Sequence, residues 1–253
     1  MFFIKKTFFK LLSKLIVFDE IYVLKSGKKI NFLVDLKAKK TFFINCHYRD
    51  YSRYISMPKK IINYKKPYAV YLDTPGPYFK DDYSLFGKKI KYNVAQWYND
   101  LNNFLLEIEK IYFCKVIIIP HPKVKSVYNP YYHKHFKICH DLDAVHNLIP
   151  NSKFVMSINA STAIGLAIAR NKPVILMYNN QQKILNNPLF NEIKFISKKI
   201  NSSLININKY KKELLLNELN KKKYKDFFYN YISSKDISKL KNYEILENIF
   251  KKV

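Results

Sequence analysis

Three short apolar runs constrain the fold of this chain more than any other feature. They span Lys115–Ile119, Phe154–Ile158 and Pro173–Met177. Runs of four to eight residues rich in Val and Ile are typical of strands buried on both faces of a parallel sheet. Between the second and third runs, residues Thr162–Arg170 predict a helix that begins near Asn159 and Ser161. Strand, helix and strand in this order predict a βαβ unit.

Polar residues follow the first two of these runs, at the point where each predicted strand ends. The residues predicted to form a phosphate or anion pocket there are His121, Pro122, Lys123, Asn159, Ser161 and Thr162. Hydroxyl groups and unpaired N–H groups at a helix N-terminus suit a phosphate, and His121 can donate to the same group or protonate it. The alternative interpretation is a capped helix and an incidental histidine.

A further buried strand is predicted over Tyr68–Leu72, and it ends in Asp73 before the rigid segment Thr74-Pro75-Gly76-Pro77. A carboxylate at a strand end, followed by such a loop, is a candidate catalytic group. The alternative role is a turn-capping aspartate.

Other patterns complete the predicted organisation. Asn93 is expected to cap a helix that runs to about Tyr112 with an apolar face. Further strands are predicted at residues 21–24, 30–34, 41–46 and 204–207. Further helices are predicted at 142–148 and 236–250, and a helix or pair of helices at 209–232. The polar segment 81–91 is predicted to link an abbreviated N-terminal α/β half, residues 1–90, to a Rossmann-like half, residues 91–253.

The strong positive charge leaves several partners open. The chain carries 45 Lys and Arg against 19 Asp and Glu, a net charge of +26. This charge favours nucleic acid, an anionic membrane or an anionic substrate. The chain is also rich in Asn, Ile, Tyr and Phe, as expected for an AT-rich coding sequence, which would supply lysine without a function. The lysines are spread along the whole chain and no nucleic-acid motif is present, so no nucleic-acid partner is predicted.

The N-terminal segment Met1–Phe18 predicts a basic amphipathic helix, which would either dock on an anionic membrane or pack on its own domain. No apolar run is long enough to span a membrane. The three cysteines, Cys46, Cys114 and Cys139, have no CxxC spacing and are expected to be reduced. A cytoplasmic protein, peripheral at the inner membrane if the helix docks there, is therefore predicted.

The segment 123–140 holds several aromatic and imidazole side chains. A ligand clamp could be formed there by Tyr128, Tyr131, Tyr132, His133 and His135. Together with His140 and His146, the two clustered histidines also raise the alternative of a zinc site. No second cluster of Cys or carboxylate ligands falls at a recognisable spacing, so no metal is predicted.

The order of these motifs resembles bacterial sialyltransferase-like glycosyltransferases of the GT-B fold, in particular members found in surface-polysaccharide gene clusters. The resemblance is carried by YLDTPGPYF (Tyr71–Phe79), IIIPHPK (Ile117–Lys123) and SINASTAIGLAIARNKPVI (Ser157–Ile175), with HYRDYSRYI (His47–Ile55) upstream. The predicted fold class is accordingly α/β, a Rossmann-like parallel sheet with flanking helices that is GT-B-like with an abbreviated N-terminal half.

The resemblance implies transfer of a CMP-activated acidic sugar from a nucleotide donor to a surface glycan or glycolipid acceptor, without a metal or another cofactor. It implies that Asp73 is the general base on the acceptor hydroxyl and that His121 stabilises or protonates the departing phosphate. It further implies that Ser161 and Thr162 hold this phosphate. The oligomeric state stays open.

Three alternatives differ from this function in kind. A nucleotide-sugar epimerase would use the same fold, but the additional acids and bases that it needs are not evident in the sequence. A basic nucleic-acid-binding module is the second alternative, but the sequence contains no known nucleic-acid-binding motif. A degenerate nucleotide-binding or membrane-surface scaffold of polysaccharide assembly would keep the fold and the positive charge without catalytic activity.

Overall fold

The computed structural model forms two compact units. It describes residues 17–29, 37–57, 64, 66–74, 76–78, 91–124, 128–184, 188–210, 216–237 and 240–251. Unit 1 comprises Met1–Ser52 and Phe228–Val253, and unit 2 comprises Arg53–Phe227. The predicted strand at 30–34, nearly all of the predicted linker 81–91 and most of the amphipathic segment Met1–Phe18 lie outside the described residues.

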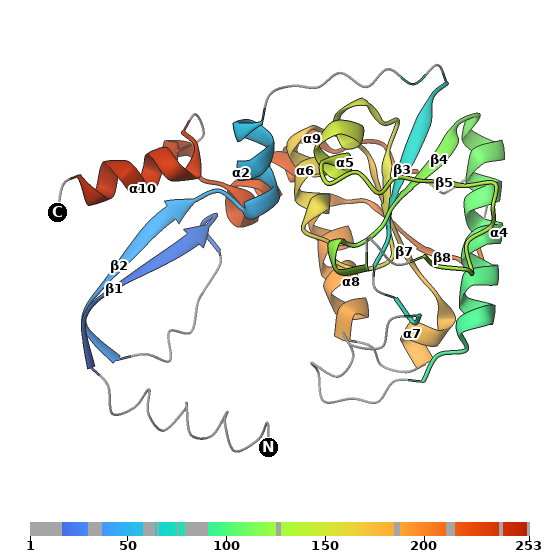
Figure 1. Ribbon diagram of the computed structural model, residues 1–253, viewed down its shortest axis with the longest axis horizontal. Coiled ribbons are helices and arrows are strands. Elements are labelled where there is room, and N and C mark those ends of the chain that lie inside the picture. Colours follow the sequence, from blue (N-terminus) through green and yellow to red (C-terminus); the bar gives the residue numbers. More distant parts are fainter. Residues whose placement is uncertain are drawn as a thin grey trace. The chain divides into compact units, whose positions relative to one another are not determined.

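Unit 2 is built on a six-stranded parallel sheet (Figure 1). Its strands are β3 (Tyr68–Leu72), β4 (Lys115–Ile119), β5 (Lys137–Ile138), β6 (Val155–Ser157), β7 (Val174–Tyr178) and β8 (Ser203–Asn206). They lie in the order β5-β4-β3-β6-β7-β8, which is the 3-2-1-4-5-6 order of Rossmann sheets. The prediction of an α/β fold with a Rossmann-like parallel sheet is confirmed.

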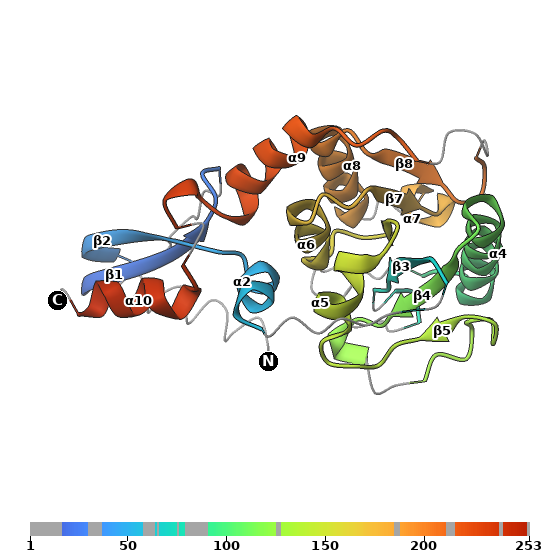
Figure 2. The ribbon, with the colours of Figure 1, turned by 90° about the horizontal axis from the view of Figure 1, so that it is seen from above.

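Helices cover both faces of this sheet. They are α4 (Val94–Tyr112), α5 (Ala144–Leu148), α6 (Ala163–Ala169), α7 (Asn180–Ile184), α8 (Pro188–Ile200) and α9 (Lys221–Phe227), and short 3-10 turns span Pro122–Val124 (η1) and Ile149–Asn151 (η2). Figures 1 and 2 show α4 on one face, and α5, α6 and α8 on the other. All five residues of β3 are buried, as expected for a central strand with both faces covered.

The long helix α4 confirms its sequence signals. The Asn93 side chain accepts a hydrogen bond of 3.1 Å from the Gln96 N–H, which is the N-cap that the sequence predicts. The apolar face is fully buried against the sheet, and it consists of Trp97, Tyr98, Leu101, Phe104, Leu105 and Ile108. The helix ends where Phe113 adopts a left-handed conformation, with φ at 48°.

The boundary predicted at residue 90 differs from the division of the structure. Tyr68–Leu72, which the sequence assigned to an N-terminal half, pairs with β4 on one side and β6 on the other. Because β3 is the centre of the sheet in unit 2, Asp73 belongs to the same unit as His121 and Ser161. The strand is apolar on both faces, so it is buried best at the centre of a sheet that helices cover on both sides. This is why it belongs to unit 2 and not to a separate N-terminal half.

Unit 1 joins the beginning of the described chain to its end. It contains β1 (Val17–Ser26) and β2 (Lys37–Cys46), which pair in parallel. The helix α2 (Arg49–Ser56) begins in this unit and ends in unit 2. A small core unites β2 with the C-terminal segment through Ile44, Cys46, Ile237 and Ile245.

The C-terminal segment is less continuous than the sequence predicted. The helix or pair of helices expected at 209–232 is restricted to α9 and a π-helical turn, η4 (Phe228–Ile232), within the described residues. The helix expected at 236–250 is divided into a 3-10 turn, η5 (Lys235–Ile237), and α10 (Asn242–Phe250). The π-helical turn belongs to unit 1. Its Tyr229 and Asn230 carbonyl oxygens accept hydrogen bonds from the Lys28 and Lys29 N–H groups.

His47 connects the two segments of unit 1 as a buried, neutral side chain. Its Nδ1 lies 2.8 Å from the Ser233 hydroxyl and its Nε2 lies 2.6 Å from the Leu240 carbonyl oxygen. Since a carbonyl only accepts, Nε2 carries the proton and donates it, and Nδ1 accepts from Ser233. Burial lowers the pKa of His47 from its ordinary value of 6.5, because the charged imidazolium is poorly solvated there.

This lowered pKa predicts that unit 1 loses stability on mild acidification. Below about pH 6.5 the unfolded chain binds a proton at His47 that the folded unit resists, so the free energy of unfolding falls as pH decreases. Hydrogen exchange of β1 and β2 at pH 7.5 and pH 5.5 would measure the loss. A His47→Gln variant should be less stable at pH 7.5 and should show a smaller change between the two pH values. An unchanged pH dependence in this variant would contradict the prediction.

Candidate functional site

The strand order brings the predicted site residues to one edge of the sheet. In a parallel sheet all carboxyl ends lie on the same side, and ligands bind where the strand order reverses. Here that reversal lies between β3 and β6. Asp73 follows β3 and the turn Asn159–Thr162 follows β6, so both flank the reversal, while His121 follows the adjacent strand β4.

Asp73 is a buried carboxyl group with an altered pKa. Its side chain is only 7% exposed, and burial raises its pKa from 3.8 to about 7. The nearby Tyr132 hydroxyl and the Thr74 N–H, which donates to Oδ1 at 2.8 Å, oppose this rise. A carboxyl group with a pKa near 7 exchanges its proton readily at neutral pH, which suits a general acid or base.

In the turn after β6, the Ser161 hydroxyl stabilises the start of α6 and can also donate a hydrogen bond to a ligand. The Ser161 Oγ accepts a hydrogen bond of 3.3 Å from the Ala163 N–H at the start of α6, while Thr162 at the N-cap position makes no side-chain capping bond. The hydroxyl proton of Ser161 can still be donated to a ligand. Thr162 is exposed beside it. The predicted helix at 162–170 is confirmed as α6.

Asn159 has a more structural position than the sequence indicated. It is buried, and its Oδ1 accepts a hydrogen bond of 3.0 Å from the Gln182 Nε2. The Asn159 carbonyl oxygen also accepts from the Ser157 hydroxyl at 2.7 Å. Asn159 therefore holds the turn that presents Ser161, and Gln182 is a supporting residue that the sequence reasoning did not assign.

The strand end after β4 carries the second predicted cluster. His121 is half-buried, and its carbonyl oxygen accepts a hydrogen bond of 2.9 Å from the Val124 N–H. This contact closes the short 3-10 turn η1, in which Pro122 is exposed. Lys123 belongs to the same turn, and its side chain lies outside the described part of the chain.

The ends of β7 and β8 hold a network of amide groups around Asp100 of α4. The carboxylate accepts hydrogen bonds from Asn179, Asn208 and Gln96 at 3.0, 2.6 and 2.7 Å. Gln182 in turn accepts from the Asn179 N–H at 2.9 Å. These amide side chains fix the ends of the strands beside the site.

A small cavity adjoins Asp73 on the side of β4 and β5. Its free volume is about 20 Å³, and it is lined by Asp73, Pro120, Val124, Tyr128, Asn129, Tyr132, Ile138 and His140. Among the described residues, neither the Asn129 Nδ2 nor the Tyr132 hydroxyl has a well-formed hydrogen bond, although both atoms are buried. The Tyr132 hydroxyl lies beside the Asp73 carboxyl group, and the Asn129 amide lies beside the Tyr98 hydroxyl, in both cases without the alignment of a hydrogen bond.

The histidines considered for a zinc site have other partners. His135 Nε2 lies 2.6 Å from Glu109 Oε2, and His133 Nδ1 accepts from the His135 N–H at 3.2 Å. In the described part of the chain no three His, Cys, Asp or Glu side chains are grouped as metal ligands would be. The Glu109–His135 pair lies near Lys115, at the amino end of β4 and thus at the sheet edge opposite Asp73.

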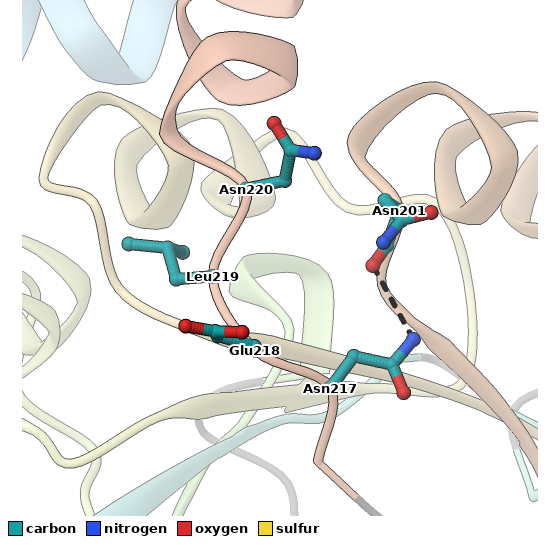
Figure 3. A pocket seen from close by; sticks show the side chains of 5 residues that line it. All are labelled: Asn201, Asn217, Glu218, Leu219 and Asn220. Carbon is teal, nitrogen blue, oxygen red and sulfur yellow. Dashed lines mark hydrogen bonds between the residues drawn. The ribbon is translucent and has the colours of Figure 1, made fainter.

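A second depression lies on this opposite edge. Figure 3 shows its lining of Asn201, Asn217, Glu218, Leu219 and Asn220, and its volume is about 540 Å³. Asn217 Nδ2 donates a hydrogen bond of 3.3 Å to the Asn201 carbonyl oxygen (Figure 3). Asn201 precedes β8, so this depression lies at the amino ends of the strands and is separate from the predicted site.

Every helix in the described residues is too short or too polar to cross a membrane. The three cysteines form no disulfide. Burial raises the pKa of Cys46 and that of Cys114, and this disfavours their reactive thiolate forms.

Comparisons with known proteins give distant matches of fold only. No protein-family model and no curated protein matches the chain. A UDP-GlcNAc 2-epimerase of Methanocaldococcus jannaschii, solved with UDP-GlcNAc and UDP, is similar at 13% identity over 84% of this chain and 55% of its own, with a TM-score of 0.43.

Two further solved structures are similar at the same level. The wall teichoic acid polymerase TagF matches at 13% identity over 81% of this chain and 49% of its own, with a TM-score of 0.38. The glycosyltransferase VinC, solved with dTDP, matches at 10% identity over 82% and 40%, with a TM-score of 0.32. The chain thus spans about half the length of the proteins that it matches, and the functional argument rests on its own residues.

Proposed function

We propose that this protein is a glycosyltransferase that moves a sugar from a nucleotide donor to a hydroxyl group of a glycan acceptor. The observation that carries this proposal is the reversal of strand order between β3 and β6. It brings a carboxyl group with a pKa of about 7, Asp73, next to a turn with hydroxyl donors, Ser161 and Thr162. Glycosyl transfer needs a base for the acceptor and a binding site for the departing phosphate.

Each residue has a defined part in this proposal. Asp73 accepts the proton of the acceptor hydroxyl as that oxygen attacks the sugar carbon. Ser161 and Thr162 donate hydrogen bonds to the phosphate, which gains charge as its bond to the sugar breaks. His121, one strand further along, stabilises or protonates the same phosphate. No metal is needed for these steps, because the hydroxyl and imidazole groups compensate the developing charge.

The proposal also covers the chemical class of the sugar donor and of the acceptor. The resemblance in the motifs favours a CMP-activated acidic sugar, and the net charge of +26 suits a donor that carries both a phosphate and a carboxylate. A surface glycan or glycolipid is the corresponding acceptor. The segment Met1–Phe18 would then hold the protein at an anionic membrane where such acceptors are assembled.

Calorimetric titration with CMP, UDP and GDP tests the proposal. We expect CMP to bind, and we expect a Ser161→Ala/Thr162→Ala variant to bind it more weakly by about 1–3 kcal/mol, the range for hydrogen bonds to charged groups. His121→Ala should also weaken CMP binding while the protein stays folded. Ser202→Ala, at the opposite sheet edge, is a matched control that should bind as the wild type does.

Other outcomes of the titration have clear meanings. A preference for UDP or GDP would keep a nucleotide-dependent transferase and discard the CMP-linked donor. If none of the three nucleotides bound, the glycosyltransferase proposal would be refuted, and the scaffold without catalytic activity would be favoured.

A further inference from the structure

The cavity beside Asp73 contains two buried polar groups that form no well-aligned hydrogen bond. Asn129 and Tyr132 are 7% and 6% exposed. In the described part of the chain, neither the Asn129 Nδ2 nor the Tyr132 hydroxyl forms a well-aligned hydrogen bond, although Asp73 lies beside Tyr132 and Tyr98 lies beside Asn129. A buried polar group without a partner costs free energy. Two such groups lining one cavity therefore indicate a place for a polar guest.

The fold holds these groups in place for reasons independent of a ligand. The Asn129 Oδ1 accepts a hydrogen bond of 3.1 Å from the Tyr131 N–H, which fixes the orientation of the amide. The Tyr132 ring packs edge-on against Tyr98 of α4, with 5.2 Å between the ring centroids. The donors are therefore fixed before a guest arrives, which reduces the entropy lost on binding.

The size and the chemistry of the cavity restrict the guest. A free volume of about 20 Å³ holds one water-sized group. The guest must accept hydrogen bonds from Asn129 and Tyr132 and donate one to the Asp73 carboxylate. A hydroxyl group has two acceptor lone pairs and one donor. A phosphate or carboxylate would meet the like charge of Asp73, and an ammonium group has no lone pair to accept with.

We propose that Asp73, Asn129 and Tyr132 form a pocket for one hydroxyl group of a carbohydrate substrate. This assignment deepens the proposed glycosyl transfer and rests on it. A water molecule meets the same pattern of donors and acceptors, so a substrate hydroxyl can replace it without loss of hydrogen bonds. Tyr128, which is 68% exposed, belongs to the lining, so the cavity borders the protein surface.

The pocket and the predicted phosphate site are close enough for one bound substrate to occupy both. The pocket lies on the β4 and β5 side of Asp73, and Ser161 follows β6 on the other side. Neighbouring strands are about 4.8 Å apart, so β4 and β6 are separated by about 10 Å. A sugar placed between them could reach the pocket with a hydroxyl while a phosphate occupies the turn at Ser161.

The first measurement is binding by a Tyr132→Phe variant, which removes one donor and keeps the ring. Calorimetry would compare CMP, UDP and GDP with CMP-N-acetylneuraminic acid, UDP-N-acetylglucosamine and GDP-mannose. We expect the affinity for free nucleotides to stay within twofold of the wild type. If the hydroxyl belongs to the donor sugar, the affinity for the matching nucleotide sugar should fall about tenfold, as for one lost hydrogen bond.

The second measurement separates the donor from the acceptor. If the hydroxyl belongs to the acceptor, Tyr132→Phe should leave donor affinity unchanged and raise the KM for the acceptor about tenfold. Asn129→Asp keeps the contact with the Tyr131 N–H and replaces the donor by a second carboxylate, so it should have the same effect or a larger one. Tyr112→Phe is the matched control, because Tyr112 lies in the last turn of α4 and does not line the cavity, and it should behave as the wild type does.

The pocket would be refuted if Tyr132→Phe and Asn129→Asp changed neither donor affinity nor acceptor KM. It would also be refuted if they weakened free nucleotides and nucleotide sugars alike, because that indicates a general structural role.

A final measurement covers the case in which the wild type binds no nucleotide and the proposed transfer fails. The ¹³C signal of the Asp73 carboxyl group would then be followed while glucose, N-acetylglucosamine or N-acetylneuraminic acid is added. A change in the wild type that is absent in Tyr132→Phe would support a hydroxyl pocket without the proposed transfer. No change with any sugar would refute both.

Discussion

An Asp73→Asn variant is expected to lose about 10²- to 10⁴-fold in the rate of sugar transfer, the contribution typical of a general base. The amide cannot take a proton from the acceptor hydroxyl. It keeps the shape of the side chain and the acceptor oxygen that the Thr74 N–H contacts at 2.8 Å. The affinity for the nucleotide should therefore be nearly unchanged. A variant with the full transfer rate would show that Asp73 is not the base.

The same substitution should stabilise the fold at alkaline pH, which is the reverse of its effect on activity. Burial raises the pKa of Asp73 from 3.8 to about 7, so between these values the folded protein holds a proton that the unfolded chain has lost. The free energy of unfolding of the wild type consequently decreases as pH rises from about 4 to about 7. The full difference is on the order of 4 kcal/mol.

Urea unfolding at pH 5 and pH 8 would measure this effect. Trp97 is the single tryptophan of the chain and is buried in unit 2, so its fluorescence reports the unit that contains Asp73. We expect Asp73→Asn to exceed the wild type in stability at pH 8 and to show a smaller pH dependence. Asp226→Asn, which removes an exposed carboxylate from α9 of the same unit, should match the wild type at both pH values.

A Gly27→Ala variant should lose about 3–5 kcal/mol of stability in unit 1, a loss typical of severe steric conflict. Gly27 has a φ of +74°, and a Cβ added there would lie 2.4 Å from the Asn230 carbonyl carbon and from the Tyr231 nitrogen. Backbone atoms cannot move aside as a side chain can. The hydrogen bonds from Lys28 and Lys29 to the π-helical turn, 3.2 and 2.9 Å long, would have to lengthen.

Hydrogen exchange of β1 and β2 is the appropriate measurement, since Trp97 does not report on unit 1. Gly76→Ala, in unit 2, is a matched control, and its loss is measured by urea unfolding followed through Trp97 fluorescence. Its φ is +56°, and the nearest atom to an added Cβ is the Tyr98 hydroxyl at 3.2 Å, the end of a side chain. The loss there should be about 1–2 kcal/mol, the cost of the left-handed conformation alone. Equal losses of unfolding free energy in the two variants would mean that the close contact of Gly27 with the C-terminal segment does not contribute to the loss.

The sheet of unit 2 could be predicted because its strands are continuous apolar runs. β4 and β6 fall within the runs that the sequence marked, β7 extends one residue beyond its run, and α4 begins after the predicted cap Asn93. β5 could not be predicted, because it has two residues, Lys137 and Ile138, inside a polar and aromatic loop. Only its pairing with β4 defines it as a strand. The parallel pairing of β1 and β2 could not be predicted for the same reason, because strand pairing depends on residues that are distant in the sequence.

The candidate site was predictable where chemistry follows a strand end directly. Asp73 and Ser161 were identified in this way, and the structure places them on either side of the strand reversal. Tyr132 was only one of several aromatic residues in a loop. Asn129 carries no signal in the sequence, because its importance comes from burial and from a free amide N–H group. Burial of a polar loop residue is decided by tertiary packing, which a single sequence does not encode locally.

The division of unit 1 between two distant segments affects the order in which the protein is completed. Arg53–Phe227 is one continuous stretch, so unit 2 can fold as soon as it has left the ribosome. Unit 1 must wait for Ile237 and Ile245 before Ile44 and Cys46 have a core to join. During synthesis, β1 and β2 are therefore exposed while all of unit 2 is made. β1 and β2 are thus translated before unit 2 but become stable after it, and chaperones would be needed most at that stage.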